Sequence, residues 1–172
     1  MKLASVAAVL EAMNRENVRV LVVGGLAVNA HGYLRFTKDA DLAIELVPNN
    51  IERAFLALAS LGYRPHVPIT AAQFADPALR ASFIRDKDMK ILQFWSDAHR
   101  ETPVDVFVIE PFDFVAEYGQ ALSESLELPD RPPVNVRYVR IATLIAMKED
   151  VARPRDLDDA QHLRWIQEEK EK

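Results

Sequence analysis

Apolar and polar residues follow two periods along this chain, one typical of helices and one typical of strands. Apolar residues recur every three or four positions over residues 2–16, which predicts a helix with one face on the core. The β-branched run 18–23 predicts a strand that ends at two adjacent glycines. A short helix over 26–31 then follows, so the chain opens with a helix, a strand and a second helix.

Strict alternation of apolar and polar residues begins near position 39. Successive side chains of a strand point to opposite faces, so in a strand over 40–46 Asp39 and Asp41 share one face with Ala43. The apolar residues between them take the other face. The pattern predicts a strand with one buried face and one face that carries acid.

The remaining pattern alternates between helices and strands. It predicts helices over about 51–61, 113–118, 141–151 and 156–169, and strands over 89–95, 104–109 and 134–139. We expect Asn49 or Asn50 to cap the first of these helices, and short helices to fill the proline-containing stretch 65–86.

This order of elements predicts an α/β (α+β) fold in which a small mixed sheet carries carboxylates on one face and helices on the other. We expect a single domain over 1–172, with a catalytic core at 1–110 and a C-terminal helical extension at 111–172.

Composition narrows the class of protein. Apolar residues make up 49% and charged residues 27% of the chain, which is typical of globular proteins. The longest apolar run contains Arg19 and two glycines and is too short to span a membrane. Without cysteine there is neither a disulfide nor a thiolate metal site, so we expect a cytoplasmic protein.

A net charge of −5 argues against a protein that coats nucleic acid through bulk electrostatics. A local basic strip remains open, because six basic residues gather in the last third of the chain. They are Arg131, Arg137, Arg140, Lys148, Arg153 and Arg155.

Two aspartates on one strand face repel each other, and a bound divalent cation offsets this repulsion. Mg²⁺ prefers oxygen ligands and binds through a few carboxylates together with substrate phosphates. Asp105 lies in another predicted strand and supplies a third acid. We therefore expect Asp39, Asp41 and Asp105 to bind Mg²⁺, with Mn²⁺ as the alternative ion. The competing interpretation is that these acids form only a solvated strand face.

Gly24 and Gly25 lie between a predicted strand and a predicted helix. Glycine allows close approach to the backbone, and the free N–H groups of a helix N-terminus favour phosphate. The pair predicts a triphosphate site beside the metal, although a plain turn is the simpler interpretation. Arg35 and Lys148 either bind the triphosphate or are solvated charges, and Thr37 either joins them or braces the strand.

Other motifs are missing from the sequence. The glycine pair has no third glycine of a dinucleotide fingerprint, and no Gly-Lys-Ser/Thr of a P-loop follows it. The four histidines have no zinc-site spacing, and no Gly-x-Ser-x-Gly of a serine hydrolase is present.

The stretch Val22-Val23-Gly24-Gly25, followed after thirteen residues by Asp39-Ala40-Asp41-Leu42, resembles the signature of the polymerase-beta-like nucleotidyltransferase superfamily. Asp105 resembles the third carboxylate of that superfamily, which arrives on a later strand. Together with His31-Gly32, Arg35 and Thr37, the string is similar to small bacterial nucleotidyltransferases that include toxin-antitoxin components.

The tail is also similar to those proteins, in which a lysine and an Arg-Asp unit lie near the nucleotide. Lys148 and Arg155-Asp156 match these positions. Those relatives often have serine at the second position of the glycine pair, where its hydroxyl contacts phosphate. Gly25 lacks that hydroxyl.

The resemblance implies an enzyme that moves a nucleoside monophosphate from an NTP to an acceptor hydroxyl and releases pyrophosphate. Asp39 and Asp41 would hold the metal ions, and Asp105 would help to activate the acceptor. The implied nucleotide-binding residues are Gly24, Gly25, Arg35, Thr37 and Lys148.

The acceptor stays open among RNA such as tRNA, proteins and small molecules, and the resemblance adds a cognate toxin or antitoxin as a partner. The alternative function is a catalytically inert nucleotidyltransferase fold that serves as a binding or regulatory protein.

Overall fold

The computed structural model describes residues 1–129 and 131–172. In chain order the elements are α1 (Leu3–Arg15), β1 (Val20–Val22), α2 (Gly24–Ala30), β2 (Ala40–Ile44), α3 (Pro48–Ser60), β3 (Arg64–Pro65), α4 (Ala71–Ala75), α5 (Pro77–Lys87), β4 (Ile91–Trp95), β5 (Val104–Phe107), α6 (Phe114–Gln120), β6 (Leu122–Leu126), β7 (Val134–Tyr138), α7 (Ile141–Val151) and α8 (Pro154–Lys170).

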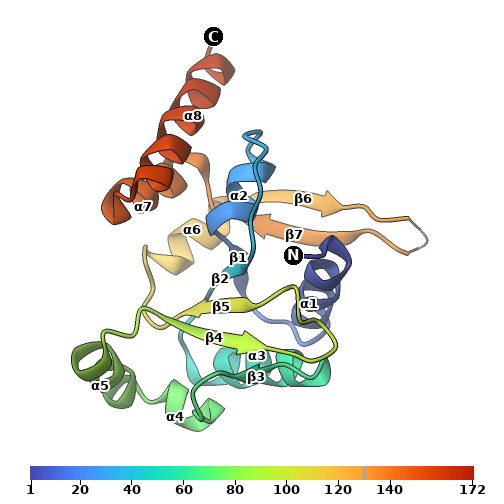
Figure 1. The fold of residues 1–172 in the computed structure, drawn as a ribbon, viewed down its shortest axis with the longest axis vertical. Coiled ribbons are helices and arrows are strands. Elements are labelled where there is room, and N and C mark those ends of the chain that lie inside the picture. Colours follow the sequence, from blue (N-terminus) through green and yellow to red (C-terminus); the bar gives the residue numbers. More distant parts are fainter. Residues whose placement is uncertain (130) are drawn as a thin grey trace.

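The strands form one seven-stranded sheet in the order β3-β4-β5-β2-β1-β7-β6 (Figure 1). β2 runs parallel to β5, and β1 runs parallel to β7, while the other neighbours are antiparallel. The structure therefore confirms the mixed sheet flanked by helices. It also confirms that β4 and β5, predicted from two strand-like runs, pair antiparallel.

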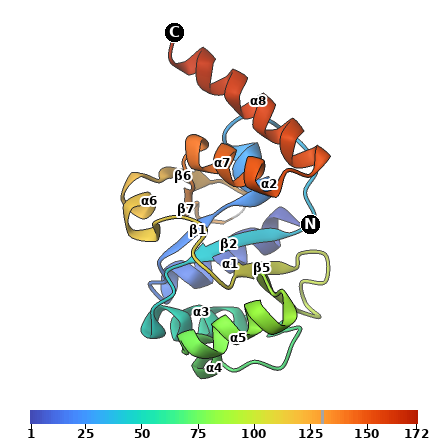
Figure 2. The same cartoon turned by 90° about the vertical axis from the view of Figure 1, so that its left-hand side faces the viewer.

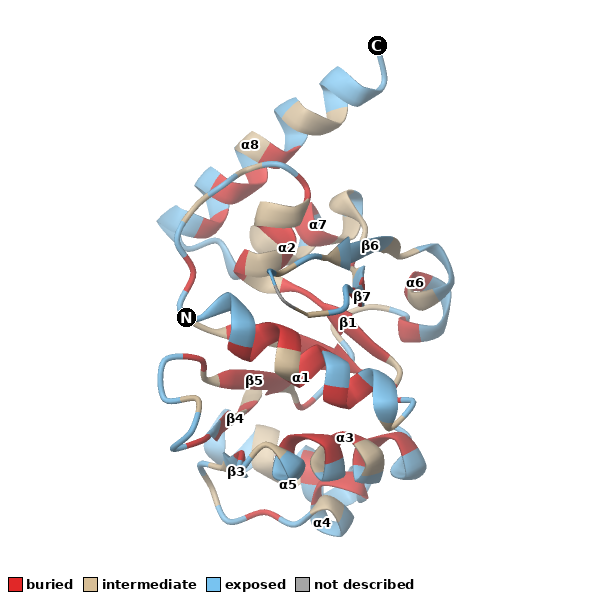
Figure 3. Ribbon diagram, turned by 90° about the vertical axis from the view of Figure 1, so that its right-hand side faces the viewer, coloured by how far each residue is buried: buried red, intermediate tan, exposed pale blue. Residues whose placement is uncertain are grey.

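The two faces of the sheet carry separate hydrophobic clusters, because successive residues of β1 point to opposite sides. Val20 and Val22 pack with residues of α1 and α3 on one face. Leu21 and Val23 pack with residues of α2 and α7 on the other. Ala43 of β2 belongs to this second cluster and is 1% exposed, so the face that carries the acids is also partly buried. Buried residues gather in α1, β1 and β5 at the middle of the molecule (Figure 3).

Several helix starts differ from those expected. α2 begins at Gly24 itself, not at Leu26. α3 begins at Pro48, whose fixed φ suits the first helical position, so neither Asn49 nor Asn50 is its N-cap. Within 65–86, the expected short helices α4 and α5 begin after the capping residues Thr70 and Asp76.

Two strands carry no clear signal in the sequence. β3 has only two residues, and β6 reads Leu-Ser-Glu-Ser-Leu, with its three central residues exposed. β6 lies at the sheet edge, where five register pairs with β7 hold it in place. Backbone pairing therefore makes β6 a strand, although its side chains have little β propensity.

The C-terminal helices α7 and α8 pack on each other next to α2, at one end of the molecule (Figure 2). Beyond this contact, α8 extends away from the sheet to the C-terminus. Within the part of the chain that the structure describes, no helix is long and apolar enough to cross a membrane.

Asn50, in the first turn of α3, joins this helix to two strands. Its side chain is fully buried, with 0% of the residue exposed. The amide oxygen accepts a hydrogen bond from the Arg19 N–H at 2.8 Å, and the amide nitrogen donates to the carbonyl oxygens of Arg19 and Glu45, each at 3.0 Å. These bonds fix where β1 begins and where β2 ends.

We expect Asn50→Ala to lower the free energy of unfolding by about 3 kcal/mol, because it leaves buried backbone groups without partners. Urea unfolding followed by circular dichroism measures this change. The exposed neighbour Asn49 provides the control, since Asn49→Ala should change stability by less than about 0.5 kcal/mol. Equal effects of both substitutions would contradict the role given to Asn50.

Candidate active site

Asp41 of β2 and Asp105 of β5 lie side by side on neighbouring strands. The two strands are parallel, and the register pairs Asp41 directly with Asp105. Residues paired in this way point to the same face of the sheet. The two predicted metal ligands are therefore brought together by strand pairing, although 64 positions separate them in the chain.

The pKa of Asp41 is raised by the surroundings of its carboxyl group. Burial is the largest cause that raises it from 3.8 to about 6, and the negative charges of Asp105 and Asp39 act in the same direction. The positive charge of Lys148 and a hydrogen bond from the Gly25 backbone N–H act in the opposite direction. Asp41 thus lies among two other acids, one cation and the first turn of α2.

Asp105 is held by a residue that sequence analysis missed. Its Oδ1 accepts a hydrogen bond of 2.9 Å from Nε2 of Gln93, which lies opposite it on β4. Burial raises the pKa of Asp105, the Gln93 hydrogen bond lowers it, and the charge of Asp39 raises it. Gln93, Asp105 and Asp41 therefore form a row across β4, β5 and β2.

Asp39 lies one residue before the start of β2. It is not a strand residue, but its charge raises the pKa of both Asp41 and Asp105. The structure thus places all three predicted acids close enough to interact. It does so from two segments, the start of β2 and the middle of β5.

The donor set of these acids suits a hard divalent cation. Within residues 1–129 and 131–172, no group of three or more His, Cys, Asp or Glu side chains is arranged so that it could hold a metal ion, so Asp39, Asp41 and Asp105 do not form a three-carboxylate site in this structure. Mg²⁺ normally uses one or two carboxylates and completes its shell with water and substrate phosphates. Partly buried carboxylates that repel one another, as Asp41 and Asp105 do, fit that mode of binding.

Both glycines are needed where α2 meets these acids. A Cβ on Gly24 would lie 1.9 Å from Oδ2 of Asp41, and the φ of Gly24 is +59°. A Cβ on Gly25 would lie 2.4 Å from Oγ1 of Thr37 and 3.1 Å from Nη1 of Arg35. The first turn of α2 is therefore in direct contact with one acid and with the segment that leads to β2.

Thr37 is 9% exposed, and its hydroxyl donates a long hydrogen bond of 3.4 Å to the carbonyl oxygen of Asp39. Its hydroxyl group occupies the space into which a side chain at position 25 would project. Thr37 is therefore in place beside the glycine pair. A hydroxyl group therefore lies next to Gly25, from residue 37.

Arg35 and Lys148, expected at the triphosphate, are both bound to a buried acid. Nε and Nη2 of Arg35 donate to the two carboxylate oxygens of Asp159 at 2.5 and 2.6 Å. Lys148 Nζ lies 2.9 Å from Asp159 and 2.9 Å from Asp156. Asp156 accepts a hydrogen bond from Lys148, and it also accepts one of 2.6 Å from Nε of Arg153.

Asp159 is the second residue of this arrangement that the sequence analysis does not single out. Arg155 donates to the carbonyl oxygen of Phe36. The helical spacing of Asp156 and Asp159 was the available signal, because it puts both acids on one face of α8. His31 is buried and its Nε2 lies 2.7 Å from the Val139 carbonyl oxygen, which gives it a structural role.

The raised pKa of Asp41 predicts how stability changes with pH. Between about pH 4 and pH 6 the folded protein holds a proton that the unfolded chain releases, so the free energy of unfolding falls as pH rises through this window. Asp41→Asn removes this effect. In EDTA we expect the variant to be more stable than the wild type by about 2 kcal/mol near pH 7, and equally stable below about pH 4.

Urea unfolding at a series of pH values measures the difference, with the exposed Asp86→Asn as the control. A difference between Asp41→Asn and the wild type that stays constant over this range would contradict the raised pKa.

The packing of Thr37 against Gly25 predicts a compensating pair of substitutions. Gly25→Ser alone should lower the free energy of unfolding by about 2 kcal/mol, because the new Cβ overlaps the Thr37 side chain. Gly25→Ser with Thr37→Gly should cost less than the sum of the two single losses, because it removes both the Thr37 Oγ1 and the Thr37 Cβ, which lie 2.4 and 2.7 Å from the new Cβ. Chemical unfolding of the two single variants and the double variant gives the coupling, and additive losses would contradict the overlap.

Comparisons with known proteins bear on this arrangement. No protein-family model and no curated protein matches the sequence. Among solved structures, the chain is similar to the antibiotic-resistance factor ANT(2'')-Ia, with a TM-score of 0.56 and 16% identity, over 95% of this chain and 81% of that one.

It is also similar to the lincomycin-bound lincosamide antibiotic adenylyltransferase LnuA, with a TM-score of 0.53 and 12% identity, over 91% of this chain and 92% of that one. At these low sequence identities, the similarity to both structures shows a shared fold and nothing beyond it. The chain therefore has a nucleotidyltransferase fold, and the expected fold class is confirmed.

Proposed function

We propose that this protein is a Mg²⁺-dependent nucleotidyltransferase, which moves a nucleoside monophosphate from an NTP to an acceptor hydroxyl. The observation that carries the proposal is the register of Asp41 with Asp105 on one sheet face, against the glycine pair that begins α2. Nucleotidyl transfer depends mainly on positioning and on neutralising charge around the phosphorus. A row of acids that can share a cation beside a glycine turn meets that demand.

The acids have separate roles in this proposal. Asp39 and Asp41 hold Mg²⁺, for which Mn²⁺ is the alternative, and the bound ion supplies charge neutralisation for the triphosphate. Asp105 accepts a hydrogen bond from Gln93 through Oδ1, which leaves Oδ2 for the acceptor hydroxyl. The raised pKa of Asp105 suits a carboxylate that takes up the proton of that hydroxyl.

Lys148, Arg35 and the first turn of α2 form the phosphate side of the proposed site. The positive charge of Lys148 lowers the pKa of Asp41, so this charge acts on the acids of the sheet. Arg35 Nη1 lies beside Gly25, and the Thr37 hydroxyl packs against the same residue. We assign nucleotide binding to these three side chains together with the backbone of Gly24 and Gly25.

The acceptor is the least defined part of the proposal. The structural neighbour LnuA is a lincosamide antibiotic adenylyltransferase with lincomycin bound. This neighbour supports small molecules among the three classes of acceptor that the sequence leaves open. The toxin-antitoxin role rests on resemblance of sequence motifs alone. The inert alternative predicts nucleotide binding at most, without release of pyrophosphate.

Incubation with each α-labelled NTP, Mg²⁺ and a cell extract fractionated into RNA, protein and metabolites tests both functions. We expect label in one fraction and release of pyrophosphate. Asp39→Asn with Asp41→Asn should lower the rate by about a thousandfold, because a metal-ligand loss removes several kcal/mol of transition-state stabilisation.

The control variant carries Asp86→Asn and Asp88→Asn, two exposed acids outside the site. It loses the same two negative charges as the Asp39/Asp41 variant. It should transfer label at the wild-type rate. Pyrophosphate release that is equal in the wild type and the Asp39/Asp41 variant would refute the assigned site. Absence of label in every fraction would favour the inert alternative.

A further inference from the structure

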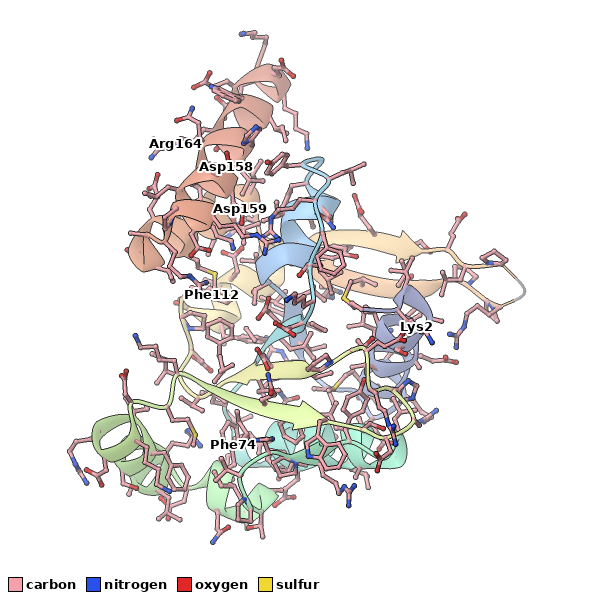
Figure 4. All side chains as sticks on the ribbon, viewed as in Figure 1. Lys2, Phe74, Phe112, Asp158, Asp159 and Arg164 are labelled. Carbon is pink, nitrogen blue, oxygen red and sulfur yellow. The ribbon has the colours of Figure 1, made fainter. Side chains whose placement is uncertain are left out.

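Asp159 lies on the side of α8 that faces α2 and the segment 31–39 (Figure 4). None of its side chain is exposed, and its two carboxylate oxygens accept hydrogen bonds from Nε and Nη2 of Arg35. The Lys148 ammonium lies 2.9 Å from the same carboxylate. A single buried acid on α8 therefore joins α7 to a residue 124 positions earlier in the chain.

Lys148 is fixed between two carboxylates. Its Nζ lies 2.9 Å from both Asp156 and Asp159, and its side chain is 11% exposed. An ammonium group has three N–H donors, so these two contacts leave one donor for another partner. The carboxylate of Asp159 that Lys148 contacts also binds Arg35, whose Nη1 lies beside Gly25, so both cations are held next to the segment that meets the first turn of α2.

Arg35 is held from two sides. Its backbone N–H donates to Asn29 of α2, and its carbonyl oxygen accepts from the same amide, each at 2.9 Å. Its Nη1 donates to the Phe36 carbonyl oxygen at 3.1 Å. With the bidentate bond to Asp159, these contacts leave the guanidinium little freedom beside Gly25.

Arg35 and Lys148 repel each other, because both are positive and both contact the same carboxylate. Asp159 offsets this repulsion by lying between them. Without its negative charge the two cations would separate, and the long flexible lysine would move toward water. Both cations then lose their place beside the glycine pair.

We propose that Asp159 is a positioning residue for the phosphates of the nucleotide. It holds the Lys148 ammonium beside Arg35, with the remaining N–H available to the triphosphate, and it fixes Arg35 against the first turn of α2. This inference rests on the proposed nucleotidyl transfer. It assigns to α8 the task of orienting the cations of the site.

The test compares Asp159→Asn with Asp158→Asn. Asp158 is the exposed neighbour on the same helix, accepts a hydrogen bond from Tyr33, and loses the same charge when substituted. The two probes are α,β-methylene-ATP with Mg²⁺ and inorganic tripolyphosphate with Mg²⁺, measured by titration calorimetry. Tripolyphosphate isolates the phosphate contacts from those of the base.

We expect Asp159→Asn to bind both probes about tenfold more weakly or worse, because an oriented charge-assisted hydrogen bond is lost. Asp158→Asn should bind like the wild type. Lys148→Met should weaken binding in the wild type but add little to Asp159→Asn, because Asp159 acts through Lys148. A residue that only stabilises the fold would shift the unfolding temperature without this coupling.

Binding by Asp159→Asn that equals or exceeds that of the wild type would overturn the positioning role and leave the proposed function standing. Absence of probe binding by the wild type would overturn both. If Asp159→Asn fails to fold, Asp159→Glu keeps the charge and displaces the carboxylate by one methylene group. The same weakening is then expected, and wild-type affinity of that variant would overturn the inference.

Discussion

Asp41 and Asp105 are forced side by side by the pairing of β2 with β5, and most other features of the site follow from that repulsion. Two partly buried carboxylates on one sheet face are unfavourable unless positive charge or N–H donors lie close. Three such groups surround them, from α2, β4 and α7. They are the backbone N–H of Gly25, the amide of Gln93 and the ammonium of Lys148.

The glycine pair is the steric counterpart of this electrostatic constraint. At Gly24 the carboxylate of Asp41 approaches so closely that no Cβ fits, and at Gly25 the Thr37 side chain fills the same kind of space. A carboxylate at the N-terminus of a helix is favoured by the free N–H groups and the helix dipole. The same contact that brings an acid to α2 therefore also requires glycine there.

The C-terminal helices complete the site from the far end of the chain. Lys148 of α7 and Asp159 of α8 extend an alternating series of charges, in which each cation touches at least one acid. Buried ion pairs of this kind add little net stability, since desolvation offsets the attraction, but they fix the geometry of the groups involved. A fixed geometry is what the proposed phosphate contact of Lys148 requires.

Local patterns in the sequence were enough to predict the strand that carries Asp41, the helix after Gly25 and the C-terminal helices, since periodicity and turn residues act over a few positions. They also indicated the three acids, because a like-charged pair on a strand face beside two glycines is unusual. The exact start of α3 was wrong, since Pro48 begins the helix more readily than Asn50 caps it.

Only the tertiary structure decided which distant residues meet. The bonds from Gln93 to Asp105 and from Arg35 to Asp159 join segments 12 and 124 positions apart. β6 likewise became a strand by pairing with β7, not by its own side chains. Such contacts depend on strand register and helix packing, which are set by the whole core and leave no periodic mark in the sequence.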